Sequence, residues 1–164
     1  MSKHPIEADY VRTKPKILLV CSAGGHLLEL YMLKEAVWSK VDRAWVTLRQ
    51  VDSESLLAGE RTYYGFGPTN RNYLNLFRNL LLAFRVLRRE RPTCVISSGA
   101  GLAIPFMYLG RLFNARTIYL ESFARFKGLS LSGRVVYPIV HDFIVQSREL
   151  TARFQKAVYR GTVF

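Results

Sequence analysis

The feature that most constrains the fold is an alternation of short apolar runs with longer helical patterns. The first run, Ile17–Cys21, contains only apolar residues, which is typical of a strand buried on both faces of a parallel sheet. A helical pattern follows it, and the alternation continues along the chain. Strands that alternate with helices predict a parallel sheet with right-handed crossovers and with helices on both faces.

The predicted fold class is therefore α/β: a single Rossmann-like, doubly wound domain over residues 16–164, after a polar tail over residues 1–15. The predicted strands are 16–21, 44–48, 60–64, 94–97, 117–120 and 142–146. The predicted helices are 27–37, 73–89, 102–113, 129–137 and one that Ser147 caps and that runs through Phe154. The apolar segment 157–164 is predicted to be a terminal or edge strand or a docking surface.

Composition narrows the class of protein further. A chain of 164 residues suits one domain, and its 49% hydrophobic content excludes a disordered chain. The 24 Lys and Arg residues exceed the 12 Asp and Glu residues, giving a formal net charge of +12. Such an excess predicts a polyanionic partner: nucleic acid, a phosphorylated substrate or an anionic membrane surface. Two cysteines, Cys21 and Cys94, form no disulfide framework, so a reduced cytoplasmic protein is expected, with neither a signal peptide nor a spanning helix.

A glycine-rich turn, Ser22–His26, joins the first strand to the first helix. Bare backbone N–H groups and the positive end of the helix favour binding of phosphate there, which makes Ser22, Gly24 and Gly25 candidate binding residues. The turn lacks the dinucleotide fingerprint and the P-loop lysine. Gly-Gly can equally serve only to let the helix pack on the sheet.

A second glycine turn, Ser97–Gly101, joins a strand to a helix in the middle of the chain. In a doubly wound sheet, the first strand and the strand that opens the second half are neighbours at the switch point, where ligands bind. We therefore expect both turns to face one crevice, with Ser98, Gly99 and Ala100 completing the binding pocket.

Two side chains near these turns are candidates for acid–base chemistry. His26 begins the first helix, where the helix dipole disfavours the imidazolium form, so we predict a neutral ring that can act as a general base. A capping or packing histidine is the alternative. Glu121 follows a predicted strand at the edge where α/β sites assemble; it is a second candidate base or a ligand for sugar hydroxyls, unless it only pairs with Arg125.

The predicted helix over 73–89 is amphipathic and carries Arg78, Arg85 and Arg89 in one stripe. An apolar face bordered by arginines is typical of a helix at a membrane surface. An ordinary sheet-covering helix with a solvated basic stripe is the preferred alternative for that face. The main apolar arc comprises Leu76, Phe77, Leu80, Leu81, Phe84 and Leu87; off that arc lie Leu74, Leu82 and Val86, which need another partner or a lipid.

Six motifs of the chain occur together in one known family: Ser22–His26, Asn70–Asn72, Ser98–Gly101, Glu121–Arg125, Leu129–Gly133 and Phe143–Gln146. With these motifs the chain resembles the acceptor-side subunit of two-chain glycosyltransferases. That family includes the eukaryotic membrane-anchoring subunit of the N-acetylglucosaminyltransferase that makes lipid-linked chitobiose, and the bacterial PssD-like subunit of capsule and exopolysaccharide synthesis. The polar tail, in place of a membrane helix, makes the bacterial branch the nearer match.

The resemblance implies the N-terminal, acceptor-binding half of an inverting GT-B glycosyltransferase split over two chains. A smaller partner would bind the UDP-sugar, a substrate rather than a cofactor, and without it this subunit of a hexosyl, glycuronosyl or N-acetylhexosaminyl transferase is expected to be inactive. The implied acceptor is a polyprenyl-diphosphate-linked saccharide at the cytoplasmic face of the inner membrane, contacted peripherally, and no metal is expected.

Two other classes of function compete with this interpretation. A basic nucleic-acid-binding module would explain the net charge, but the sequence carries no RNA- or DNA-binding motif. A standalone nucleotide-binding enzyme would need a ribose-binding acid after the second strand; Asp52 lies near that position without the usual fingerprint.

Overall fold

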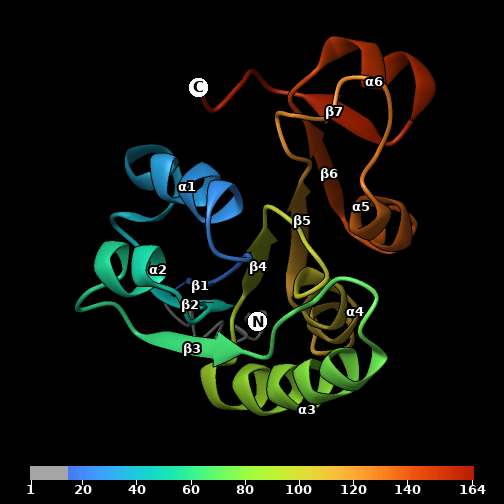
Figure 1. The fold of residues 1–164 in the computed structure, drawn as a ribbon. Helices are drawn as coiled ribbons and strands as arrows, with labels where there is room; N and C mark the ends of the chain where they lie inside the picture. The colour runs from blue at the N-terminus through green and yellow to red at the C-terminus, as the bar shows by residue number, and fades with distance from the viewer. Residues whose placement is uncertain (1–14) are drawn as a thin grey trace, which may run out of the picture.

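Figure 1 shows the computed structural model, which describes residues 15–164. Of the predicted tail, all but Pro15 lies outside the described residues. The strands are β1 (Lys16–Val20), β2 (Asp42–Leu48), β3 (Thr62–Gly65), β4 (Cys94–Ser97), β5 (Arg116–Leu120), β6 (Asp142–Val145) and β7 (Ala157–Tyr159). The helices are α1 (Gly25–Met32), α2 (Val51–Leu56), α3 (Tyr73–Glu90), α4 (Ala103–Leu112), α5 (Leu131–Val136) and α6 (Arg148–Arg153), with a π-helical turn η1 (Lys34–Trp38) after α1.

All strands pair in parallel in one sheet, in the order β3-β2-β1-β4-β5-β6-β7. The predicted α/β class is confirmed. β1 lies between β2 and β4, and Val20 at its carboxyl end pairs with Val46 and Ser97. The strand order reverses at β1 and β4, so this edge is the switch point at which α/β proteins bind ligands.

Two layers of helices cover the sheet (Figure 1). Alternate residues of β1 belong to two different hydrophobic cores. Leu18 and Val20 join the core beneath α3, α4 and α5. Ile17 and Leu19 join the core beneath α1 and η1, which includes Trp38. The central strand is therefore buried on both faces, which explains its uninterrupted apolar sequence.

The elements depart from the sequence-based predictions in three places. The first predicted helix stops at Met32, and η1 replaces its last turn; there buried Trp38 donates from its indole to the Leu30 carbonyl at 2.8 Å. The helix α2 was not predicted, because its six residues are mostly polar and show no apolar period. Ser147 occupies the N-cap position of α6, but its side chain makes no capping hydrogen bond.

The orientation of α3 differs from the preferred prediction. Of the residues expected to cover the sheet, Leu87 is buried, but the other five are exposed; Phe77, for example, is 58% exposed and Leu81 45%. The side that faces the sheet includes Val86, from outside the predicted arc, and Asn79, whose amide forms hydrogen bonds with both backbone groups of Phe66.

No helix within residues 15–164 has the length and apolar character needed to cross a membrane.

Candidate functional site

The two glycine turns meet at the carboxyl ends of β1 and β4, as predicted. The Ser98 hydroxyl donates to the His26 carbonyl oxygen at 2.6 Å, and the Gly99 N–H donates to the Ser97 hydroxyl at 3.1 Å. Gly99 has φ +121°, and a Cβ there would lie 3.1 Å from Cε1 of His26. Ser98 and Gly99 are buried, so they support the His26 ring, whereas Ala100 lines an open cavity.

That cavity has a volume of about 370 Å³ and opens where the second turn, the loop before α3 and the start of α5 come together. His26 lies at its wall with its side chain 30% exposed. The positively charged members of the wall are Arg71 and Arg125, which are suited to an anionic ligand. The remaining lining residues are Thr69, Asn70, Asn72, Tyr73, Leu76, Asn79, Ala100, Gly101, Ile104, Ser130, Leu131 and Ser132.

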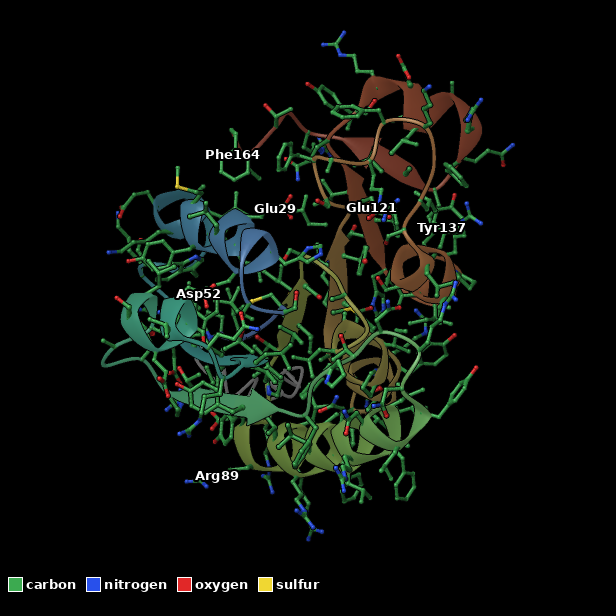
Figure 2. All side chains as sticks on the ribbon, viewed as in Figure 1. Glu29, Asp52, Arg89, Glu121, Tyr137 and Phe164 are labelled. Atoms are coloured by element: carbon green, nitrogen blue, oxygen red, sulfur yellow. The ribbon has the colours of Figure 1, made fainter. Side chains whose placement is uncertain are left out.

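The first glycine turn contributes less to the cavity than its sequence predicts. Ser22, Gly24 and Gly25 do not line it. The Gly24 N–H donates to the Asp52 carboxylate at 2.6 Å, so an internal anion already takes one of the groups predicted for phosphate. Asp52 extends from the first turn of α2 and fixes the loop that carries His26 (Figure 2).

Glu121 is buried and is held by the protein itself. Its Oε2 accepts from the N–H and the hydroxyl of Ser130 at 2.9 and 3.1 Å, and its Oε1 accepts from the Ser122 N–H at 3.2 Å. Burial raises the pKa of this carboxyl, although these donors oppose the shift. Within residues 15–164, Glu121 forms no ion pair with Arg125. It also does not line the cavity. Its hydrogen bonds to Ser130 indicate that it positions the loop before α5.

Glu29 is a member of the site that the sequence analysis missed. It is 1% exposed, and its Oε2 lies 3.7 Å from Nδ1 of His26. Figure 2 shows it between α1 and the end of β5, near Glu121. The signal was present in the sequence: an acidic residue three positions after the histidine, among leucines that a helix would bury.

A second, apolar cavity of about 350 Å³ lies between α3 and α4. It shares Tyr73, Leu76 and Ile104 with the polar cavity, so the two cavities are adjacent. Its other lining residues are Phe77, Leu80, Pro105 and Tyr108. A polar, arginine-lined cavity thus lies beside an apolar groove, which suits an amphipathic ligand with a charged head and a hydrocarbon tail.

The cysteines are not suited to nucleophilic chemistry. Burial raises the pKa of Cys21 to about 12 and that of Cys94 to about 11, so both thiols stay protonated at neutral pH. Burial likewise raises the pKa of Tyr119, beneath the site, to about 12. Among the described residues, no three His, Cys, Asp or Glu side chains come together as metal ligands.

Replacing Glu121 with glutamine should change how stability depends on pH. Because the pKa of the folded carboxyl is raised above its ordinary value of 4.5, the native state holds the proton longer, and stability from this group falls as pH rises from about 4.5. Glu121→Gln removes that decline, so its melting temperature relative to wild type should increase from pH 4.5 to pH 8. A constant difference would contradict the assignment, and exposed Glu149→Gln serves as the control.

Comparison with known proteins places this chain in a family. The family model described as "Oligosaccharide biosynthesis protein Alg14 like" matches residues 68–163. The rat UDP-N-acetylglucosamine transferase subunit ALG14 is 32% identical over 193 residues, covering 99% of this chain and 88% of the relative. The Candida albicans protein of the same name is 26% identical over 179 residues, covering 92% of this chain and 82% of the relative.

Solved structures show the same fold at low sequence identity. Acinetobacter baumannii MurG superposes with a TM-score of 0.71 at 15% identity, over 92% of this chain and 46% of that protein. S. aureus MnaA with UDP superposes with a TM-score of 0.72 at 11% identity, over 91% and 44%. The chain therefore spans about half the length of these proteins and has the fold of the N-terminal half of a GT-B glycosyltransferase such as MurG. Its sequence shows, through the family model and the rat relative, that the chain belongs to the Alg14-like family of oligosaccharide biosynthesis proteins.

Proposed function

We propose that this chain is the acceptor-binding, membrane-associating subunit of a two-chain inverting glycosyltransferase. The observation that carries the proposal is the cavity lined by His26 and two arginines beside an apolar groove, on a domain about half the length of MurG. The curated relatives are named UDP-N-acetylglucosamine transferase subunits, which supports a UDP-sugar donor. The acceptor is a polyprenyl-diphosphate-linked saccharide, and the pathway is exopolysaccharide or capsule synthesis.

In the proposed reaction, His26 takes the proton from a hydroxyl group of the acceptor sugar. The hydroxyl oxygen attacks C1 of the donor sugar, the bond from C1 to the UDP oxygen breaks, and UDP leaves with inversion at C1. Arg71 and Arg125 hold the acceptor's phosphates, and the backbone around Ala100 orients its saccharide. Gly24, Ser98 and Gly99 support the turn that carries His26.

The lipid of the acceptor would follow the groove between α3 and α4 toward the exposed face of α3. That face presents large apolar side chains next to Arg78, Arg85 and Arg89, which are exposed. Apolar side chains bordered by cations suit a peripheral contact with an anionic membrane surface, here the cytoplasmic face of the plasma membrane. The exposed apolar residues of α3 are Tyr73, Leu74, Leu76, Phe77, Leu80, Leu81 and Phe84.

The donor-binding partner is a smaller α/β chain, and we place its contact at the carboxyl-terminal side of this domain. β7 is the edge strand of the sheet and comprises only Ala157–Tyr159 of the segment 157–164, for which a terminal or edge strand or a docking surface was predicted. The residues after it fold back: the Val163 N–H donates to Gln146 at 2.8 Å, and Phe164 packs edge-on against Phe123 with centroids 5.1 Å apart. Because the Phe123 N–H donates to Glu29 at 3.0 Å, Phe123 links the terminus to α1.

Reconstitution tests the proposal. The purified chain alone is expected neither to bind UDP tightly nor to transfer sugar, whereas the complex with the donor-binding chain should transfer sugar to a polyprenyl-diphosphate saccharide. Formation of radiolabelled product in detergent is the measurement. Robust transfer by the isolated chain, or no transfer by the assembled complex with any UDP-hexose, UDP-hexuronate or UDP-N-acetylhexosamine, would contradict it.

A further inference from the structure

Two buried polar atoms at the start of α1 face each other without a hydrogen bond to any described residue: Nδ1 of His26 and Oε2 of Glu29. They lie 3.7 Å apart, one helical turn from each other. Burying a polar atom without a hydrogen-bond partner is unfavourable, so each is the natural partner of the other. Hydrogen bonds between catalytic groups are often long in the unliganded protein and shorten when substrate binds.

The Glu29 carboxylate is fixed from its other oxygen. Oε1 accepts from the Ser122 hydroxyl and from the Phe123 N–H, both at 3.0 Å. These two donors come from the loop after β5, so Glu29 joins that loop to α1. With Oε1 held in this way and the side chain buried, Oε2 has little freedom to turn away from His26.

We propose that Glu29 is a positioning residue for His26. Its Oε2 keeps a hydrogen on Nδ1 of the neutral ring, so that Nε2 is left without one and is free to accept a proton from a ligand in the cavity. The protonation pattern is a property of this chain alone; its consequence for sugar transfer rests on the proposed function. A carboxylate that orients a histidine base in this way fixes both its tautomer and its ring plane.

Replacing Glu29 with glutamine should move the ring hydrogen of His26 from Nδ1 to Nε2, while a side chain of nearly the same size still fills the position. Two donors, from Ser122 and Phe123, favour the glutamine oxygen at the place of Oε1, so the amide NH₂ faces His26. Nδ1 must then accept a hydrogen bond, and the hydrogen moves to Nε2. Glu29→Gln therefore forces the tautomer that cannot act as a base.

Nitrogen-15 NMR of the imidazole rings, recorded on the full chain at alkaline pH, tests the tautomer directly. His26 is expected to carry its hydrogen on Nδ1 in the wild type and on Nε2 in Glu29→Gln. His141 is an internal reference, because its Nδ1 accepts from the Thr117 N–H at 3.0 Å and its hydrogen must be on Nε2 in both proteins. A wild-type His26 with its hydrogen on Nε2, or one unchanged by Glu29→Gln, would overturn the proposal.

Kinetics of the two-chain complex supply the second readout. Glu29→Gln should lower kcat about 10²–10⁴-fold, the range for loss of a correctly oriented base, with KM for both substrates changed by less than about 3-fold. Glu29→Asp should recover part of kcat, and exposed Glu35→Gln is the control. An unchanged kcat in Glu29→Gln would contradict the positioning role. If the tautomers are as expected but the wild-type complex transfers no sugar, only the proposed function is contradicted.

Discussion

Replacing His26 with alanine is expected to lower the rate of sugar transfer by about 10³-fold or more, near the upper part of the range that a positioned general base contributes. The loss should fall on kcat, because the arginines that bind the acceptor remain in place. The variant should fold, since the ring is partly exposed and the turn keeps its Ser98 and Asp52 hydrogen bonds to backbone atoms. The measurement is initial velocity in the reconstituted complex.

Two controls separate the role of His26 as a base from a structural role. His141→Ala removes the same side chain at the amino end of β6, away from the cavity, and should keep wild-type kcat. Imidazole added to His26→Ala should restore part of the activity, because it can enter the space of the missing ring and accept the proton. Wild-type turnover by His26→Ala would exclude His26 as the base.

The parts of the fold that could be predicted are those that local sequence determines. Uninterrupted apolar runs such as Ile17–Cys21 identify parallel strands, and glycine turns after Val20 and Ser97 identify the carboxyl edge of the sheet. The two glycine turns meet because the strands on either side of a switch point must be neighbours in the sheet. The juxtaposition of His26 with the second turn was therefore predictable before any coordinates.

The orientation of α3 was not predictable in the same way. A helical period reveals an apolar arc, but not whether that arc faces the sheet or the surroundings. The buried side contains Asn75, Asn79 and Glu90, which sequence reasoning assigns to water. Each has a partner outside the helix: the Pro68 and Phe66 carbonyl groups for the two amides and Lys16, at 2.6 Å, for the carboxylate. Only tertiary contacts make those burials favourable.

The two acidic residues near the site show the same limit of sequence reasoning. Glu121 follows a strand at the ligand-binding edge, which is the usual position of a functional carboxylate, yet Ser122 and Ser130 occupy both its oxygens. Glu29 lies inside a helix, where a carboxylate is ordinarily solvated, yet it is buried beside His26. Position relative to a strand end predicts proximity to a site, whereas the hydrogen bonds decide which atoms remain available.

The exposed arc of α3 leads to a second large effect, on membrane binding. Changing Arg78, Arg85 and Arg89 together to glutamine should weaken binding to vesicles rich in anionic lipid by about 10²-fold, because each basic side chain near such a surface contributes about 1 kcal/mol. All three are exposed on one side of α3, and Arg89 points away from the body of the domain in Figure 2. Vesicle co-sedimentation at fixed salt measures the change.

A matched variant decides whether position or total charge matters. Lys34, Lys40 and Arg49 are also exposed but lie on the side of the sheet covered by η1 and α2, so changing them to glutamine removes the same three charges elsewhere. This variant should bind vesicles nearly as well as wild type if the face of α3 meets the membrane. Equal losses of vesicle binding in both variants would indicate a diffuse attraction to polyanions. If the protein instead binds RNA with a steep dependence on salt and does not bind vesicles, a nucleic-acid-binding module is favoured. Because the apolar arc is bordered by the arginines that only the first variant removes, a difference between the two isolates the contribution of that face from the net charge of +12.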